Sequence, residues 1–171
     1  AIERIPNGVD TERFAPVGSE VKASLRERFQ IPQDARVAIF TGRLVQYKGL
    51  PLLLRVWKEI QRRHPDALLL LVGSGGLGID NCEQALRSEV ASSGLEQSVR
   101  FTGAVENVHE YLQASDVFVF PTEHEAFGIS LIEAMACGIP SIATPVGGVE
   151  EILAGGRNGL IVELGNSDLL L

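Results

Sequence analysis

Two carboxylates lie close together in the stretch TEHEAFGISLIEAMACGIP, which covers residues 122–140. Glu125 stands in the polar part of this stretch, and Glu133 follows after seven residues, inside the apolar run ISLIEAMA. A buried carboxylate without a partner costs roughly several kcal/mol, so Glu133 either faces solvent on a polar side of a helix or meets a hydrogen-bond donor. The vicinal hydroxyl groups of a sugar are such a pair of donors.

The residues from Pro121 to the second carboxylate predict a loop followed by the start of a helix. Pro121 ends an apolar run, residues 122–127 form a loop, and Gly128 opens a helical segment. The first N–H groups of a helix have no partner within it, so a helix start is suited to anions such as phosphate. We expect an anion there, with Glu125 beside it. The N–H groups concerned belong to Gly128, Ile129, Ser130 and Leu131.

A second loop with charged residues, TGRLVQYKG, covers residues 41–49 and carries Arg43 and Lys48. It follows an apolar run and precedes a helical pattern, but it lacks the G-x-x-x-x-G-K-[ST] spacing of a phosphate-binding P-loop. Two cations in one strand-to-helix loop are suited to clamp a diphosphate, with Arg43 as a planar fork and Lys48 as a point charge. The alternative is that both are solvated surface charges.

The stretch GSGGLG, residues 73–78, matches the dinucleotide-binding pattern G-x-G-x-x-G at Gly73, Gly75 and Gly78. It follows the second expected strand rather than the first. The acidic residue expected about 20 positions later is also poorly placed, because Glu96 falls in the next loop. The pattern therefore favours a glycine-rich turn that lets chain or ligand pass closely over nicotinamide binding.

Three other chemistries have little support. His124 stands between Glu123 and Glu125, but adjacent residues rarely converge on one metal ion, and His64 and His109 are distant in sequence. No G-x-S-x-G motif is present, so a serine hydrolase is not indicated. Paired carboxylates also occur in glycoside hydrolases, but that chemistry explains neither the basic loop nor the helix start.

The elements that must position these residues alternate regularly along the chain. Short apolar runs bounded by Gly, Pro, Asp or Thr predict strands, and segments with three- and four-residue apolar spacing predict helices. Six strands that alternate with five helices indicate an α/β fold, a Rossmann-like doubly wound parallel sheet with helices on both faces. The expected strands cover 37–40, 67–73, 99–103, 116–121, 140–144 and 159–162, and the expected helices cover 50–63, 82–92, 108–114, 129–137 and 149–153.

Composition sets the broad class. The 171 residues are 45% hydrophobic, which is enough for one substantial core, and we expect a lead-in segment at 1–35 followed by the sheet domain at 36–171. A net charge of -7 argues against nucleic acid. No apolar run is long enough to span a bilayer and no signal segment opens the chain, so we expect no insertion into a membrane. Cys82 and Cys137 fit reduced thiols and a cytoplasmic location.

Taken together, these residues resemble the carboxyl-terminal half of retaining glycosyltransferases of the GT-B fold, in the large group 1 class, also called family four. The similarity runs almost from end to end, and the Glu125–Glu133 spacing is its most specific part. The matching segments, in the family's order, are IPNGVD (5–10), FTGRL and YKG (40–49), LLLVGSG (69–75), VRFTGAV (99–105), ASDVFVFPT and EAFGISLIEAMACGIPSIAT (114–144), GGVEEIL (147–153) and NGLIV (158–162).

The resemblance implies that this half of the enzyme binds a nucleotide-sugar donor and that three residues are catalytic. Arg43 and Lys48 would bind the donor diphosphate and stabilise negative charge on the leaving nucleotide. Fixed cations do this best because they interact more strongly with the transition state than with the ground state. Glu125 would face the transferred hexose. With cations supplied by the protein, the resemblance implies neither a metal nor another cofactor.

The resemblance also assigns the nucleoside end of the donor. Glu133 would accept hydrogen bonds from the ribose hydroxyls, backbone groups around Ala104 and Val105 would meet the base, and Gly73 would line the pocket. The donor-binding residues implied in this way are Gly42, Gly73, Ala104, Val105, Phe127, Gly128, Ile129, Ser130, Leu131 and Glu133.

Two departures from the family pattern limit the prediction. The family usually has E-G-F-G where this chain has EAFG, so Ala126 would cost about 1 kcal/mol if its φ had to be positive. The amino-terminal half that binds the acceptor in this family is not in the sequence, so we expect the chain alone to bind donor weakly and not to turn over. The parent's acceptor and any association with the inner face of a membrane are left open. The alternatives are a nucleotide-sugar epimerase-like protein and an NAD-dependent oxidoreductase domain.

Overall fold

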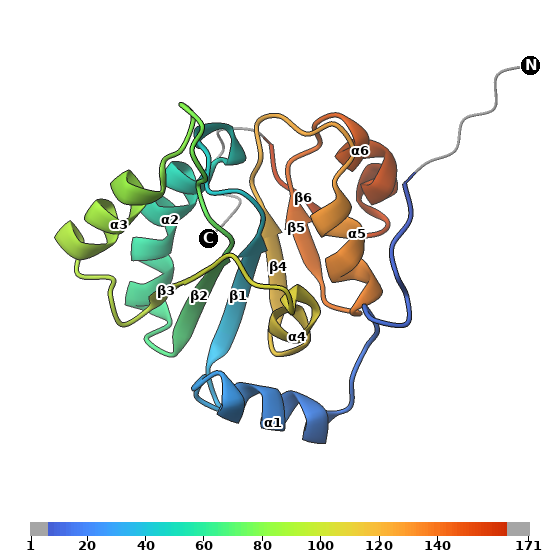
Figure 1. Cartoon of the computed structure of the whole chain (residues 1–171), viewed down its shortest axis with the longest axis horizontal. Helices are drawn as coiled ribbons and strands as arrows, with labels where there is room; N and C mark the ends of the chain where they lie inside the picture. Colours follow the sequence, from blue (N-terminus) through green and yellow to red (C-terminus); the bar gives the residue numbers. More distant parts are fainter. Residues whose placement is uncertain (1–6, 164–171) are drawn as a thin grey trace, which may run out of the picture.

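The computed structural model describes residues 7–163 of the chain. They form one six-stranded sheet in which every strand pair is parallel, with helices packed along it (Figure 1). The predicted Rossmann-like α/β class is therefore confirmed. The strands are β1 (Arg36–Thr41), β2 (Ala67–Val72), β3 (Val99–Gly103), β4 (Val117–Phe120), β5 (Ser141–Ala143) and β6 (Leu160–Ile161), and the helices are α1 (Ser19–Arg28), α2 (Leu50–Arg63), α3 (Glu83–Ser92), α4 (Val108–Gln113), α5 (Ile129–Ala136) and α6 (Gly148–Leu153), with 3-10 turns at Gln46–Lys48 and Ala154–Gly156.

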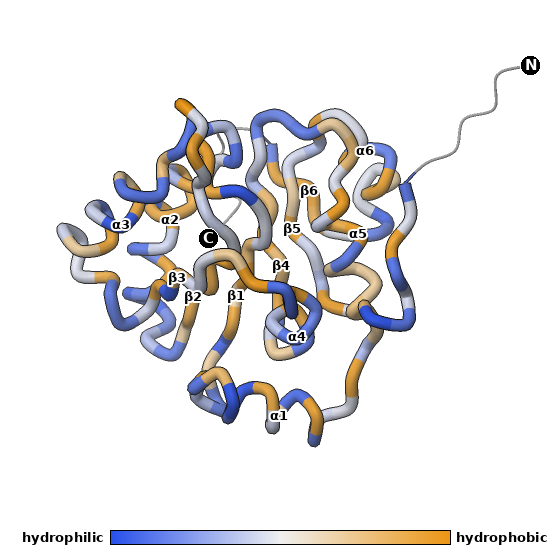
Figure 2. The backbone as a smooth tube through the Cα atoms, in the orientation of Figure 1, coloured by the Kyte–Doolittle hydropathy of each residue, from blue (hydrophilic) through white to orange (hydrophobic). Residues whose placement is uncertain are grey.

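The strands form where the sequence is continuously apolar because a parallel sheet is covered on both faces. All six residues of β2 are buried, as are the last five residues of β1. Figure 2 shows hydrophobic residues along β1 and β4 and hydrophilic residues along many of the connecting loops. The predicted strands and helices are all present, and each end agrees with the expected one or differs from it by one residue.

The strand order β3-β2-β1-β4-β5-β6 places the first strand in the middle of the sheet, next to the fourth. From β1 the chain moves outward through β2 to β3, and from β4 it moves outward in the opposite direction. Figure 1 shows the result, with α2 and α3 grouped beside β2 and β3, and α5 and α6 beside β5 and β6. The loops after β1 and β4 therefore part at the carboxyl ends of adjacent strands, which is the topological switch point where sheets of this kind bind ligands.

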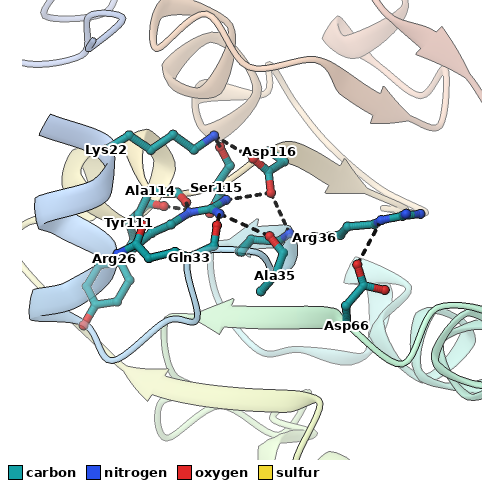
Figure 3. Close-up of polar contacts among 11 residues, drawn as sticks. Lys22, Arg26, Gln33, Ala35, Arg36, Asp66, Tyr111, Ala114, Ser115 and Asp116 are labelled. Carbon is teal, nitrogen blue, oxygen red and sulfur yellow. Dashed lines mark hydrogen bonds and ion pairs between the residues drawn. The ribbon is translucent and has the colours of Figure 1, made fainter. Parts of the chain in front are cut away.

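The lead-in segment is fastened at the opposite, amino-terminal edge of the sheet. Asp116, just before β4, accepts hydrogen bonds from Lys22 Nζ at 2.6 Å, Arg26 Nη2 at 2.7 Å and the Val37 N–H at 2.8 Å (Figure 3). Burial alone would raise the pKa of Asp116, but these hydrogen bonds and the two cations outweigh it and lower the pKa. Arg26 is 6% exposed and also donates to backbone carbonyls. This cluster holds α1 against β1 and β4.

Candidate functional site

The switch point holds an open cleft of about 600 Å³. Its walls come from the loop after β1, the loop after β4 and the short loop after β5. Among the residues singled out from the sequence, Arg43, Lys48 and Glu125 line this cleft. The full lining is Arg43, Tyr47, Lys48, Glu123, His124, Glu125, Ala126, Val146 and Gly147. The structure therefore brings together the three residues predicted to be catalytic, from two loops almost 80 positions apart in the chain.

Lys48 and Glu125 form a partly buried ion pair on the wall of the cleft. Lys48 Nζ lies 2.7 Å from Glu125 Oε2, and the two side chains are 12% and 17% exposed. The other carboxylate oxygen, Oε1, accepts the N–H groups of Ala126 at 2.9 Å and Phe127 at 3.3 Å. Burial would raise the pKa of Glu125, but the Lys48 contact and the two backbone donors lower it. Glu125 is thus held as a carboxylate in a fixed orientation.

Tyr47 arranges the basic side of the cleft. A 3-10 turn at Gln46–Lys48 brings Tyr47 between Arg43 and Lys48, and the Arg43 guanidinium donates to the Tyr47 hydroxyl. The Lys48 ammonium lies 5.6 Å from the centre of the Tyr47 ring and 5.1 Å from that of Phe120, within the range of cation–π attraction. The reading of Arg43 and Lys48 as unrelated surface charges is therefore disfavoured, because both converge on one ring beside the cleft.

The loops around the cleft cross at positions where only a glycine fits. A Cβ on Gly49 would lie 1.9 Å from the Pro121 carbonyl oxygen, one on Gly73 would lie 1.9 Å from that of Gly42, and one on Gly147 would lie 1.9 Å from that of Glu125. Real Cβ atoms do not approach other atoms so closely. The loops after β1, β2, β4 and β5 are consequently interlocked, and the position of Glu125 is fixed by the loop after β5 as well as by Lys48.

The start of α5 differs in one respect from the prediction. Gly128 has φ 101° and leads directly into the helix, as expected for a glycine that starts it. The Leu131 N–H, however, donates to the Gly128 carbonyl at 3.0 Å, so Leu131 is not one of the free donors. Among residues 7–163, no hydrogen bond uses the N–H groups of Gly128, Ile129 and Ser130. Three free donors rather than four remain at this helix start.

Glu133 is half-buried on α5, and burial raises the pKa of its carboxyl, an effect that the charge of Arg13 partly opposes. None of the described residues donates a hydrogen bond to this carboxylate. Glu133 therefore resembles the expected case of a carboxylate without a donor, as far as residues 7–163 are concerned. It does not line the 600 Å³ cleft.

The remaining predicted residues lie on the loops at the carboxyl edge of the sheet, next to the cleft rather than in its wall. The Gly42 N–H bonds to Val72, and the Gly73 N–H donates to the Gly103 carbonyl at 2.9 Å, which ties the loops after β1, β2 and β3 together. Ala104, in the last of these loops, is exposed, whereas Val105 is half-buried. Phe127 is half-buried and contributes its N–H to Glu125.

The glycine-rich stretch 73–78 departs from the geometry of the dinucleotide-binding pattern. In the dinucleotide-binding pattern the glycines run directly into a helix whose first N–H groups hold a pyrophosphate. Here α3 begins only at Glu83, and the Glu83 carboxylate accepts the Gly75 N–H at 2.9 Å. The Glu83 carboxylate thus takes up a glycine N–H of this turn, which favours the predicted glycine-rich turn over a pyrophosphate site.

Six cleft residues were not predicted as site residues: Glu123 and His124, which were considered only for a metal, Ala126, which was considered only as a departure from the family pattern, and Tyr47, Val146 and Gly147. Tyr47 stands inside the loop that carries Arg43 and Lys48, so its position next to Lys48 was the available signal. Val146 and Gly147 belong to the loop after β5 and line the cleft. Their place in the site becomes visible only in the structure, where Gly147 closely approaches the Glu125 carbonyl.

Within residues 7–163, no three His, Cys, Asp or Glu side chains gather in a way that could hold a metal ion. In the part of the chain that the structure describes, no helix has the length and apolar character needed to cross a membrane.

Comparison with known proteins identifies the family. The family model for glycosyl transferases group 1 matches residues 21–171. The chain belongs to this family. The resemblance inferred from the sequence motifs is therefore confirmed at the level of the group 1 glycosyltransferases and their GT-B architecture.

Curated relatives of this group 1 domain match it nearly end to end. D-inositol 3-phosphate glycosyltransferase of Corynebacterium jeikeium is 36% identical over 170 residues, which cover 95% of this chain and 40% of that protein. The GDP-mannose-dependent alpha-(1-6)-phosphatidylinositol monomannoside mannosyltransferase of Mycolicibacterium smegmatis is 34% identical over 172 residues, covering 95% of this chain and 43% of that protein. The chain thus spans about 40% of the length of the curated relatives it matches.

Solved structures of other glycosyltransferases have a similar fold. HepE of Anabaena, in complex with UDP and glucose, superimposes with a TM-score of 0.86 at 27% identity, over 96% of this chain and 44% of that one. Sucrose-phosphate synthase of Thermosynechococcus elongatus gives a TM-score of 0.83 at 32% identity, over 97% of this chain and 40% of that one. The group 1 domain described here is therefore similar to one part of each of these larger proteins.

Proposed function

We propose that this domain binds the nucleotide-sugar donor of a retaining glycosyltransferase, which transfers a hexose to an acceptor held by the rest of the enzyme. The observation that carries the proposal is the convergence of Arg43, Lys48 and Glu125 on one cleft at the switch point of the sheet. HepE, whose fold is similar, was crystallised with UDP-glucose as well as with UDP, which supports a donor of this class.

The basic residues would hold the diphosphate. Breaking the bond between the sugar C1 and the phosphate oxygen leaves its electron pair on the nucleoside diphosphate, so negative charge grows there during the reaction. Arg43, steered by Tyr47, and Lys48 are fixed cations beside that position, and the free N–H groups of Gly128, Ile129 and Ser130 are fixed dipoles. Each such group is expected to supply about 3–4 kcal/mol of transition-state stabilisation.

Donor binding would change the partner of Lys48. The Lys48 ammonium is neutralised by Glu125 in the structure described here, and a bound diphosphate would share that positive charge. The Glu125 carboxylate keeps its two backbone donors, so it remains oriented while its outer oxygen turns to the hydroxyl groups of the hexose. In this arrangement Glu125 also favours positive charge at the sugar C1, where the acceptor oxygen attacks, and the proton of the acceptor hydroxyl passes to the phosphate oxygen released from C1.

Glu133 would supply the acceptor for the ribose hydroxyls. Its half-buried carboxylate lacks a donor among the described residues, and the two hydroxyl groups of a ribose offer two donors at the spacing of a carboxylate. This pairing would stabilise the ionised form of a group whose pKa is raised by burial. It answers why an acidic residue stands in an otherwise apolar helix.

The proposal is tested by calorimetric titration of the complete enzyme with UDP, GDP, ADP and NAD. We expect one nucleoside diphosphate to bind selectively, Glu133→Ala to weaken it, and Glu89→Ala, an exposed glutamate on α3, to leave it unchanged. Lys48→Ala and Arg43→Ala should lower turnover by about one to three orders of magnitude, whereas Lys58→Ala on the exposed side of α2 should not. Binding of NAD alone, or donor kinetics untouched in the Lys48 and Arg43 variants, would overturn the proposal.

A further inference from the structure

A short segment ahead of the sheet crosses both α4 and α5. Its first turn is organised by Asp10, whose side-chain Oδ1 accepts the N–H groups of Glu12 at 3.1 Å and Arg13 at 3.2 Å, while its carbonyl accepts the Phe14 N–H at 2.8 Å. Aspartate commonly closes turns of this kind with its own side chain. Because the backbone of Arg13 is held in this turn, its side chain leaves the segment in a defined direction.

The Arg13 guanidinium reaches the loop that follows β3. Its Nε donates to His109 Nδ1 at 3.1 Å, and its Nη2 donates to the carbonyl oxygen of Glu106. The Phe14 ring packs edge-on against the His109 ring, with the ring centres 5.9 Å apart. Burial and the nearby Arg13 charge lower the pKa of His109, so its ring is neutral near pH 7 and can accept the hydrogen bond.

The same guanidinium acts on α5. The Arg13 charge counters the effect of burial on Glu133 and so favours its carboxylate form. The segment is tied to both helices nearby: Gln113 Nε2 of α4 donates to the Ala15 carbonyl at 3.0 Å, and a Cβ on Gly138, just after α5, would lie 3.1 Å from Pro16. Arg13 is thus hydrogen-bonded to the loop after β3, and its charge also acts on Glu133, with no hydrogen bond between the two among the described residues.

We infer that Arg13 is a positioning residue for the nucleoside end of the donor site, which holds the loop of residues 104–107 in place through its hydrogen bonds to Glu106 and His109. The inference rests on the proposed function, since that function gives the loop to the base and Glu133 to the ribose. Arg13 contacts neither the cleft with Lys48 and Arg43 nor the diphosphate expected there. Its effect should therefore fall on the nucleoside and spare the phosphates.

A purely structural role is the competing explanation, and the chain supplies a matched control for it. Arg28 also reaches α4 from the lead-in segment, where it pairs with Glu110 through both guanidinium Nη atoms. It fastens the same helix and makes no hydrogen bond with residues 104–106 or with Glu133, and its link to the loop runs only through Glu110, which also accepts a hydrogen bond from Asn107 Nδ2. Comparing Arg13→Ala with Arg28→Ala therefore separates the fastening of α4 from the positioning of the nucleoside site.

The test is a calorimetric titration of the complete enzyme and both variants with UDP, GDP, ADP and inorganic pyrophosphate, with the melting temperature recorded for each protein. For the nucleoside diphosphate that wild type binds most tightly, we expect Arg13→Ala to raise Kd about 3- to 30-fold, the range for residues that act through others. Pyrophosphate affinity should stay within about 2-fold of wild type, because a change that small lies inside the usual scatter of remote substitutions. Arg28→Ala should leave both affinities at the wild-type level.

The ratio of the two affinities decides the outcome, because a general loss of stability would weaken both ligands together. An Arg13→Ala variant that binds the nucleoside diphosphate as wild type does, or that loses pyrophosphate to the same extent, overturns the inference while the proposed function stands. A wild-type enzyme that binds none of the three nucleoside diphosphates overturns the proposed function, and the inference with it.

Discussion

The ion pair between Lys48 and Glu125 leads to a prediction about stability. Lys48→Met keeps the length of the side chain but removes the ammonium 2.7 Å from a carboxylate that is 17% exposed. Removing one partner of a buried pair typically costs about 3–5 kcal/mol. Glu125 keeps two backbone donors here and borders an open cleft, so we expect a loss of about 2–3 kcal/mol in the free energy of unfolding at pH 7.

Urea unfolding followed by the fluorescence of Trp57 measures this loss. Trp57 is the single tryptophan of the chain and is 3% exposed, so its emission reports unfolding of the core. The matched control is Lys58→Met, which removes an exposed lysine from α2 and should change the free energy of unfolding by less than about 0.5 kcal/mol.

The loss should depend on pH in a defined direction. Because the pKa of Glu125 is lowered in the folded protein, the pair contributes stability above the ordinary pKa of 4.5 and loses it as the pH falls through the folded value. In Lys48→Met, burial is no longer opposed by the cation, and protonation of Glu125 relieves the variant. The difference between wild type and variant should therefore be largest near neutral pH and shrink below about pH 4.5.

A double-mutant cycle with Glu125→Gln isolates the pair from other effects of each substitution. We expect a coupling energy of about 1–3 kcal/mol, in the range measured for residues in direct contact. A coupling below about 0.5 kcal/mol, or a loss in Lys48→Met that does not change with pH, would refute the reasoning, because either result means that the two side chains are not paired in solution.

Three further predictions use the same unfolding assay. Gly147→Ala, which places a Cβ 1.9 Å from a carbonyl oxygen, should cost more than about 2 kcal/mol, whereas Gly76→Ala, with a similar positive φ but open space, should cost only about 1 kcal/mol. Thr41→Val should be neutral or stabilising by about 1 kcal/mol, because the Thr41 hydroxyl is buried with no partner among the described residues; a clear loss would mean that this hydroxyl has one. Asp116→Asn should lower the free energy of unfolding by about 1–2 kcal/mol at pH 7, which is less than for a fully buried pair because the Asp116 side chain is 39% exposed. Since the pKa of Asp116 is lowered in the folded protein, this loss should fade as the pH falls below the ordinary value of 3.8, and a loss that persists in acid would contradict the reasoning.

The fold could be predicted largely because local patterns determine it. The six buried residues of β2 are a continuous apolar run, and the spacing of Leu53, Val56 and Trp57 marks the core side of α2. Element ends were less accurate because the last turn of a helix and the last pair of a strand depend on neighbours. The 3-10 turn at Gln46–Lys48 was missed for a related reason: its three polar residues carry no periodic signal.

The candidate site was predictable in its residue types and less so in its contacts. Because Arg43, Lys48 and Glu125 follow apolar runs, the sequence correctly placed them at the carboxyl-terminal edge of the sheet. Their pairing was not visible, because it depends on β1 and β4 being neighbours, and the strand order is not written in any local pattern. The Leu131 N–H was counted as free because a sequence does not show that the first turn of α5 closes on Gly128.

The interlocked loops around the cleft have a consequence for exchanging loops between this protein and its homologues. Transplanting the loop after β4 from a homologue would carry its own carbonyl oxygens to positions 49 and 147, where any side chain in the recipient would collide with them. A graft of one loop therefore succeeds only in a recipient with glycine at both positions. Libraries that vary the loop after β4 should therefore keep glycine at positions 49 and 147, and clones with a side chain at either position should misfold.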